Sequence, residues 1–528
     1  MRSRETLEDL SWNGSTHFNQ FGDKEIVKVI QNSDERSKND LDDEPSRIER
    51  DLLARQEEIE SESRERERIE KIKEEKEKLR RIKERIGNIE EKIDAAKNES
   101  PSLVDSLRSI FSWRNYSVYL ATSWVYAAFS YMGVFLTVYL SAELHWEYVL
   151  IGAVLSVVAA VSAISRLIGG YVGDVSNRKS LSVVAMFMMA MYNLILGASR
   201  EFTWILIALL FFSTMDIFKG GSTAFIMDNI PKKHGGLGIS LFSAGRVFGI
   251  VTLGVFVILS QPDNFGVALQ SMFLLGGVFL TFSAIARAIL LKGSAPDTKR
   301  EGVSLLRSFY QENKRALTML LKAVPGMIAI VILDSLSDAL FKFGSYLYIY
   351  DQVQIKIPGL TLMTIVTIIV SVPLLLGSGR FSDRRGERKT ALLVYSLMPL
   401  CALLLLISPI FPYWVPEFVR NQADSVFNGL GAIFSTPFVA LVLKSVNDSV
   451  WYLLLLTIIQ KNLPRRDTAK ILSVFWFIVY LLSSIGPFVG GFLFQYFYQG
   501  YLFVVVFVLN LIILGWIATR GLVRPAEE

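Results

Sequence analysis

The sequence of 528 residues has almost no cysteine or histidine: it holds one cysteine, Cys401, and three histidines. A single cysteine excludes an internal disulfide, and so few thiols and imidazoles exclude a zinc site built from Cys and His. No Gly-x-x-x-x-Gly-Lys-Ser/Thr sequence occurs, which argues against direct coupling to a nucleoside triphosphate. We therefore expect no metal, no cofactor and no enzyme activity.

Charge is scarce in most of the chain and concentrated at its start. Residues 1–100 hold 22 Lys or Arg and 28 Asp or Glu, whereas the other 428 residues hold only 33 and 22. The net charge of +5 therefore averages two unlike parts and gives no indication of nucleic-acid binding. Residues 1–46 contain no apolar stretch of signal-peptide length, so we expect membrane insertion to be directed by later segments.

The charged amino-terminal part divides into two segments. Residues 1–45 lack apolar periodicity and are expected to be disordered. Pro45 and the capping-box sequence Ser46-Arg-Ile-Glu49 then predict a charged helix over 46–98. Isoleucine or leucine recurs every seven residues from Ile72 to Ile93, which favours a coiled coil and self-association or a protein partner through 69–96. A lone charged helix or a hairpin within the chain fits the same pattern.

The remainder is dominated by apolar stretches long enough to cross a bilayer as helices. We predict an all-α membrane protein with twelve transmembrane helices in two halves, 110–291 and 319–520. A charged central loop, 292–318, separates the halves, and 521–528 forms a tail. The expected spans lie near 116–141, 148–172, 181–199, 203–228, 237–260, 265–291, 323–349, 357–379, 390–411, 438–463, 470–493 and 500–519.

Basic residues are distributed unevenly between the loops. One alternating set of loops, together with the central loop and the tail, carries 21 Lys or Arg, whereas the opposite set carries Arg200, Lys356 and Arg420. The positive-inside rule then places both termini and the central loop in the cytoplasm, and we expect a multi-pass protein of the plasma membrane.

Two of the cytoplasmic loops repeat each other, after the second and the eighth expected span. Each contains a Gly-x-x-x-Asp step, and both the glycines and the aspartates are 209 residues apart. Such spacing indicates a parallel duplication, with a left-handed turn expected at Gly386 or Asn177. The repeated glycine and charged positions are Gly170, Asp174, Arg178 and Lys179 in the first loop, and Gly379, Asp383, Arg384, Gly386, Arg388 and Lys389 in the second.

This loop motif in a six-plus-six protein resembles that of the major facilitator superfamily. The second copy matches better, because the first has Val175 and Asn177 where the family has Arg and Gly. The resemblance covers residues 110–520 and implies a secondary active transporter that works by alternating access. It also implies that Asp174, Asp383 and their neighbours act in gating rather than in binding the solute.

Ionisable residues inside the expected spans are costly and therefore point to function. The seventh span places Asp334, Asp338 and Lys342 on one helical face, four residues apart. Two carboxylates one turn apart in a low dielectric cannot both ionise cheaply, so we expect one to hold a proton. These three residues are our candidates for proton coupling, and a structural pair between Lys342 and Asp338 is the alternative.

A second set of charges lies in the fourth, fifth and tenth spans. Asp216 and Arg246 are each 15 residues from Pro231, so they are expected at one depth and could form an ion pair. The candidates for a solute cavity are Asp216, Lys219, Arg246, Lys444 and Asp448. Acids and bases balance within the combined set of buried charges, which favours a polar solute such as a zwitterion.

These observations predict a proton-coupled transporter of a small organic solute. The alternative is a membrane-anchored sensor or scaffold that presents the coiled coil to a cytoplasmic partner. A mere anchor has no use for the buried charges. Fold alone does not identify the solute.

Overall fold

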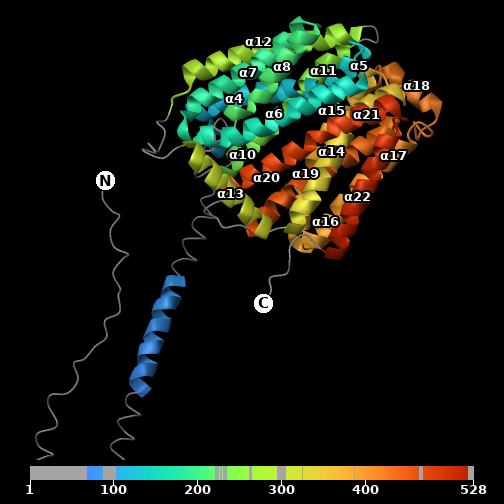
Figure 1. Ribbon diagram of the computed structural model, residues 1–528. Helices are drawn as coiled ribbons and strands as arrows, with labels where there is room; N and C mark the ends of the chain where they lie inside the picture. The colour runs from blue at the N-terminus through green and yellow to red at the C-terminus, as the bar shows by residue number, and fades with distance from the viewer. Residues whose placement is uncertain are drawn as a thin grey trace, which may run out of the picture. The chain divides into compact units, whose positions relative to one another are not determined.

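The structure is a computed structural model, and Figure 1 shows its course. It describes residues 68–86, 103–219, 225, 229, 235–260, 264–293, 305–323, 325–385, 387–462 and 468–520. Within these residues the chain is helical, and β structure is limited to one isolated bridge between Tyr413 and Ser435. The chain divides into two compact units, Met1–Ser100 and Pro101–Glu528.

The first unit contains one described helix, residues 68–86. Its charged side chains pair along the helix, as between Lys78 and Glu74 at 2.8 Å. Ile72, Leu79 and Ile86 are half or more exposed, so the predicted seam is available for pairing. The coiled coil remains a prediction. Segment 1–45, the rest of the predicted helix, the tail and residues 294–304 of the predicted loop 292–318 lie outside the described residues. Residues 305–318 of that loop lie on a helix, α13 (Leu305–Ala323).

The amino-terminal half of the second unit is a bundle of long apolar helices (Figure 1). They are long and apolar because leucine, valine, alanine and phenylalanine fill most positions between the charged loops. The described elements are α3 (Leu103–Phe111), α4 (Arg114–Ser130), η1 (Tyr131–Phe135), α5 (Leu136–Ala142), α6 (Tyr148–Val175), α7 (Arg178–Ala198), α8 (Phe202–Thr214), α10 (Gly235–Ala244), η3 (Gly245–Phe248), α11 (Gly249–Leu259) and α12 (Phe265–Leu290).

The carboxyl-terminal half forms the second bundle, which begins after α13 (Leu305–Ala323). In Figure 1 its yellow to red helices lie beside the green helices of the first bundle. The elements are α14 (Pro325–Asp351), α15 (Ile357–Arg385), α16 (Glu387–Tyr395), α17 (Leu397–Ile407), α18 (Glu417–Val426), η5 (Leu430–Phe434), α19 (Thr436–Asn462), α20 (Thr468–Ser483), α21 (Ile485–Tyr496) and α22 (Tyr501–Arg520).

Eight of the described helices are long and apolar enough to cross a membrane. A ninth span is possible in the pair Asn313–Leu321 and Gly326–Asp351, which bends by 104° at its break. Two further expected spans correspond to the shorter apolar helices Gly245–Leu259 and Ile357–Ser371, and the tenth corresponds to α19. The all-α membrane fold is confirmed, whereas twelve full-length spans are not all shown.

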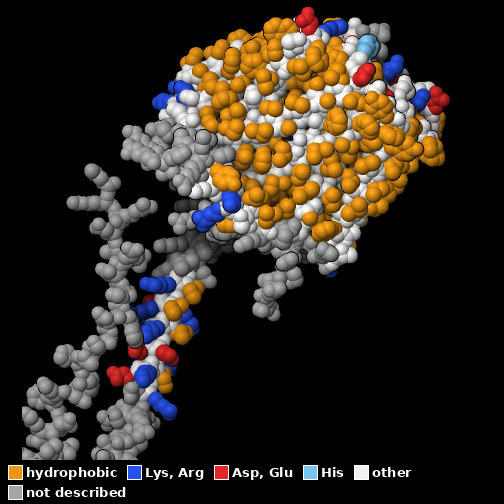
Figure 2. Space-filling view, viewed as in Figure 1, with side chains coloured by type: hydrophobic (Ala, Val, Ile, Leu, Met, Phe, Trp, Pro, Cys, Tyr) orange, Lys and Arg blue, Asp and Glu red, His pale blue; other side chains and the backbone are white. Residues whose placement is uncertain are grey.

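The surface of the second unit is apolar. Figure 2 shows hydrophobic side chains covering its visible face, with charged side chains mostly near the edges of the view. Exposed large residues such as Phe282, Ile289 and Val251 are more than 60% exposed, which a protein in water would avoid but acyl chains accommodate. The interior is packed with aromatic side chains, including Phe135, Phe256 and other fully buried rings.

The two halves contact each other closely through α6 and α21. A Cβ atom on Gly152 would overlap Pro487 O, and one on Gly491 would overlap Tyr148 O. The Phe488 amide also donates to Ser156 Oγ at 2.8 Å. The glycine-rich run of α21 is thus a close-packing device, which lets two helix backbones approach.

The turn between α6 and α7 differs from the expectation. Asn177 is not left-handed, because its φ is −65° and its ψ is 114°. Its side chain instead caps α7, accepting a hydrogen bond from the Lys179 amide at 2.9 Å. Asparagine favours this capping role at least as much as a left-handed turn, and Gly386 lies outside the described residues.

Candidate functional site

A cavity of about 490 Å³ lies where the two halves meet. Thr137, Leu155 and Ala159 line it from α5 and α6 of the amino-terminal half. Helices α14, α19, α20 and α21 supply the other wall, and their lining residues include Asp334, Asp338, Lys342, Asp448, Trp451 and Tyr480. Of the charged residues predicted on the seventh and tenth spans, all but Lys444 therefore line this one cavity.

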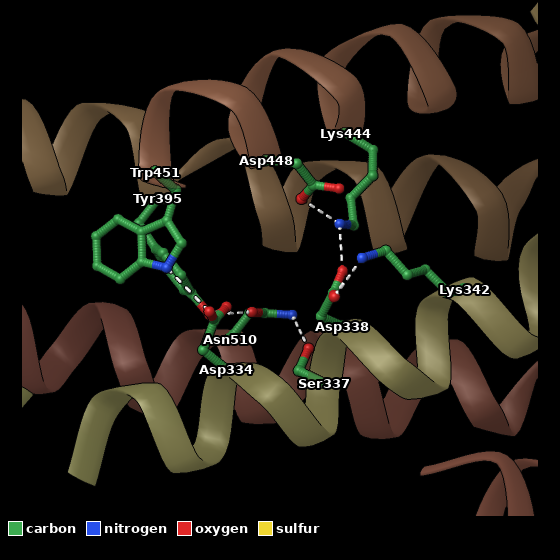
Figure 3. Close-up of polar contacts among 9 residues, drawn as sticks. All are labelled: Asp334, Ser337, Asp338, Lys342, Tyr395, Lys444, Asp448, Trp451 and Asn510. Atoms are coloured by element: carbon green, nitrogen blue, oxygen red, sulfur yellow. Dashed lines mark hydrogen bonds and ion pairs between the residues drawn. The ribbon is translucent and has the colours of Figure 1, made fainter. Parts of the chain in front are cut away.

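Asp338 is the centre of an ion-pair cluster on this wall (Figure 3). Its Oδ2 lies 2.7 Å from Lys342 Nζ on the same helix, and its Oδ1 lies 2.7 Å from Lys444 Nζ on α19. Lys444 also pairs with Asp448, one turn along α19. The cluster thus contains two carboxylates and two ammonium groups, which balance in charge.

Asp334 lies one turn from Asp338 but has neutral partners (Figure 3). Trp451 Nε1 donates to its Oδ2 at 2.9 Å, and the Tyr395 hydroxyl lies 2.8 Å from its Oδ1. The same hydroxyl lies 2.8 Å from Asn510 Oδ1. Helices α16 and α19 therefore contact the carboxyl group of Asp334 on α14 through hydrogen bonds, and α22 is joined to it through the Tyr395 hydroxyl.

Asn510 is oriented by contacts that lie deeper in the bundle. Its Nδ2 lies 2.7 Å from both Val506 O and Ser337 Oγ. Asn510 and Ser337 are fully buried, as is the ring of Tyr395. A backbone carbonyl only accepts hydrogen bonds, so the amide nitrogen of Asn510 faces Val506 and its oxygen faces Tyr395.

The predicted pair between Asp216 and Arg246 is wrong. Asp216 Oδ2 instead lies 2.7 Å from Arg166 Nε on α6. The Arg166 guanidinium also lies 3.5 Å from the centre of the Tyr480 ring on α20, so this pair contacts the carboxyl-terminal half. Equal depth in neighbouring helices does not fix which face a side chain takes, and here α6 supplies the partner.

The predicted charges do not share a single balanced cavity. Lys219 and Arg246 line a second cavity, of about 220 Å³, within the amino-terminal half. Arg287 of α12 joins them, and none of the three aspartates of the first cavity takes part. The expectation that all the buried charges surround one neutral cavity is therefore corrected.

Several polar residues of these sites were missed from the sequence. Arg287 lies inside an expected span, so the rule that found the aspartates could have found it. Tyr395, Trp451 and Asn510 give no such signal, because single polar or aromatic residues are common in membrane helices. The neighbouring sequence does not determine the direction in which these side chains point.

The repeated loops are described only in part. Gly170 lies in the last turns of α6, and Arg178 and Lys179 begin α7. Gly379, Asp383 and Arg384 fall on α15, and Arg388 and Lys389 on α16. The side chains of Asp174, Asp383, Arg384 and Arg388 lie outside the described ones, so their gating role stays a prediction. In the described part of the chain, no group of three or more His, Cys, Asp or Glu could hold a metal ion.

A family model described as the Major Facilitator Superfamily matches residues 118–487. The chain belongs to this superfamily. The match spans most of both helical halves, which confirms the resemblance carried by the repeated loop. Membership in the superfamily makes the protein a multi-pass membrane protein and supports secondary transport of a solute as its function.

Solved structures show the same superfamily fold. The nucleoside transporter NupG has a TM-score of 0.54 at 12% identity, covering 77% of this chain and 96% of that one. A POT family transporter in complex with 5-aminolevulinic acid has a TM-score of 0.56 at 13% identity, covering 77% and 96%. A bacterial homolog of the human lysosomal transporter Spinster has a TM-score of 0.50 at 14% identity, covering 77% and 94%. No curated protein matches the chain.

Proposed function

We propose that the protein is a proton-coupled secondary transporter of a small organic solute, which works by alternating access. It resides in the plasma membrane with both termini in the cytoplasm. Asp334 is the proton-binding residue, and Asp338, Lys342, Lys444 and Asp448 form the charged wall beside it.

The observation that carries the proposal is the shared hydroxyl of Tyr395. The hydroxyl has one hydrogen and two acceptor oxygens at 2.8 Å, Asp334 Oδ1 and Asn510 Oδ1, and we assign its hydrogen to Asn510. The 2.8 Å contact between the Tyr395 oxygen and Asp334 Oδ1 then needs a hydrogen on Asp334. Charge balance points the same way, since the neighbouring two carboxylates and two ammonium groups already neutralise each other.

Release of this proton would rearrange the contacts of four helices. An ionised Asp334 takes the hydrogen of Tyr395, and the oxygen of Asn510 then loses its donor. Asn510 lies on α22 and Tyr395 on α16, so the protonation state of a cavity residue is linked to helix packing. Such a link is what coupling a proton to a conformational change requires.

The halves meet at the end that the positive-inside rule places outside. There the Tyr148 hydroxyl donates to Asp351 Oδ2 at 2.8 Å, and the Tyr148 amide donates to Gln495 Oε1 at 3.0 Å. We assign these bonds to the external closure that opens in the alternate state. The loops that contain Asp174 and Asp383 govern the opposite, cytoplasmic closure.

The test is proton flux into proteoliposomes that hold a pH-sensitive dye, measured as pooled solutes are added. We expect a solute-dependent flux for the wild type and none for Asp334→Asn, because the amide mimics the protonated acid and cannot release a proton. Counterflow exchange of the same solute should persist in Asp334→Asn. Normal concentrative transport in that variant would overturn the coupling assignment.

A second measurement needs no solute. A protonated carboxylic acid gives an infrared carbonyl band that is separate from the amide band, and we expect the wild type to show one that Asp334→Asn lacks. Tyr395→Phe is the matched control, since it keeps the carboxyl group but removes its hydroxyl partner, and its band should shift in position. Absence of the band in the wild type at neutral pH would contradict a stored proton.

A further inference from the structure

The second cavity differs in charge from the first. The cavity has a volume of about 220 Å³. Its lining residues come mainly from α4, α7, η3 and α12 and are largely apolar or aromatic. Three lining residues are cationic, namely Lys219, Arg246 and Arg287, and no described lining residue is acidic. An excess of positive charge within a membrane helix bundle is unfavourable unless an anion offsets it.

Arg287 is the most unusual of the three cations because it is only 2% exposed. Its Nε donates to Thr122 Oγ1 at 2.8 Å, its Nη1 to Ser182 Oγ at 2.8 Å, and its Nη2 to Ser123 Oγ at 2.8 Å. Nη1 also donates to Ser182 O at 3.2 Å. These acceptors, three hydroxyls and one backbone carbonyl, are neutral and hold the guanidinium in place without cancelling its charge. Its carbon Cζ also lies 4.1 Å from the centre of the Tyr119 ring.

The acidic residue nearest to Lys219 in the sequence, Asp216, already forms an ion pair. Asp216 precedes Lys219 by three residues, but its carboxylate pairs with Arg166 at 2.7 Å and it does not line the cavity. Lys219 Nζ lies 5.5 Å from the Tyr126 ring centre, and both residues line the cavity. Within the described residues, the wall therefore combines positive charge with aromatic surface.

We propose that this cavity binds the anionic group of the transported solute, and that the solute is an organic anion with an apolar or aromatic body. This inference rests on the proposed transport function, because it takes the occupant to be the solute. Guanidinium and ammonium groups supply charge-assisted hydrogen bonds to a carboxylate or phosphate, and the rings of Tyr119 and Phe242 pack against its body. The first cavity, which Asp334 lines, then serves to bind the proton.

The chain allows a direct test, because its one cysteine, Cys401, is buried. We would place Ala127→Cys in the second cavity, in a Cys401→Ser background. Its reaction rates with the anionic sulfonatoethyl and the cationic trimethylammonioethyl methanethiosulfonates are then compared in detergent. We expect the anionic reagent to react on the order of tenfold faster, because a cleft of one sign concentrates the opposite ion.

Ala159→Cys is the matched control, since it lines the first cavity with Asp334 and Asp338. There the preference should be lost or reversed. Arg246→Gln and Arg287→Gln, each added to Ala127→Cys, should lower the preference for the anionic reagent. Arg246 is exposed and outside the Arg287 hydrogen-bond set, so its variant keeps the test valid if Arg287→Gln fails to fold.

Occupancy is tested with benzoate and its neutral analogue benzamide, which have nearly the same shape. Benzoate should slow modification of Ala127→Cys, whereas benzamide at equal concentration should not. Equal rates with both thiol reagents, or no reaction while Ala159→Cys reacts, would overturn the proposal. Protection by vesicles of phosphatidylglycerol but not by benzoate would assign the cavity to lipid and equally overturn it.

These measurements use no ion gradient and no transport. A charge preference with benzoate protection but without solute-dependent proton flux would therefore refute proton coupling and leave the anion site standing. The reverse result would refute the anion site alone.

Discussion

Lys444 is the residue on which the charge balance of the cavity wall depends. It is 5% exposed and contacts two carboxylates, those of Asp338 and Asp448. We expect Lys444→Met to lower the free energy of unfolding by about 3 kcal/mol, because it leaves a carboxylate uncompensated in a low dielectric. Titration of the purified protein with a denaturing detergent measures the loss.

Lys342→Met is the matched control for this prediction. Lys342 also pairs with Asp338, but its side chain is 64% exposed toward the cavity. Water already screens that charge, so the expected loss is below about 1 kcal/mol. Equal losses in the two variants would contradict the assignment of Lys444 as the buried counter-charge.

For single residues, the sequence predicts which side chains are candidates for function better than it predicts which side chains they contact. Asp334, Asp338 and Asp448 could be selected because an ionisable group in a membrane helix needs a reason. The partner of Asp216 could not, since Arg166 and Arg246 were both within reach and only the rotation of α6 decides between them. Tyr395 and Asn510 acquire their meaning through a contact between residues that are 115 positions apart.

Among the helices, the contact between α6 and α21 depends on missing side chains. A Cβ on Gly491 would overlap the backbone of Tyr148, whereas one on Gly515 of α22 would meet nothing within 4 Å. We expect Gly491→Ala to destabilise the protein by about 1–3 kcal/mol through overpacking, and Gly515→Ala to be neutral or mildly stabilising. Thermal unfolding of the two variants makes the comparison, and equal midpoints would show that the helices yield without strain.

Helix positions follow from the sequence, and helix lengths follow less well. Each span predicted from an apolar stretch corresponds to a helix or a pair of helices in the structure, because hydropathy reflects the bilayer directly. The helix α19 shows the limit of that rule. Its charged residues Lys444 and Asp448 reduce its hydropathy, yet the fold keeps it helical over Thr436–Asn462 because both belong to the ion-pair cluster around Asp338.

The orientation of the whole molecule is testable with the same single-cysteine background. The positive-inside rule places Glu201 outside and the chain end at Glu528 inside. In intact cells, a membrane-impermeant thiol reagent should label Glu201→Cys, and it should label Glu528→Cys only after permeabilisation. The opposite pattern would invert the molecule and reassign the contact between Tyr148 and Asp351 to the cytoplasmic side.

The amino-terminal unit differs from the helical body in composition. Residues 1–100 form a unit of their own, and the described helix 68–86 leaves its apolar residues exposed. Deletion of residues 1–100 should therefore leave solute-dependent proton flux within about twofold of the wild type, since every charged residue of both cavities lies beyond residue 160.

Replacement of Ile72, Leu79 and Ile86 by serine in the full chain is the control for the seam. It should abolish any self-association seen by cross-linking while keeping transport. Loss of transport in the deletion, with the body folded, would favour the alternative in which the arm is the working part and the body its anchor.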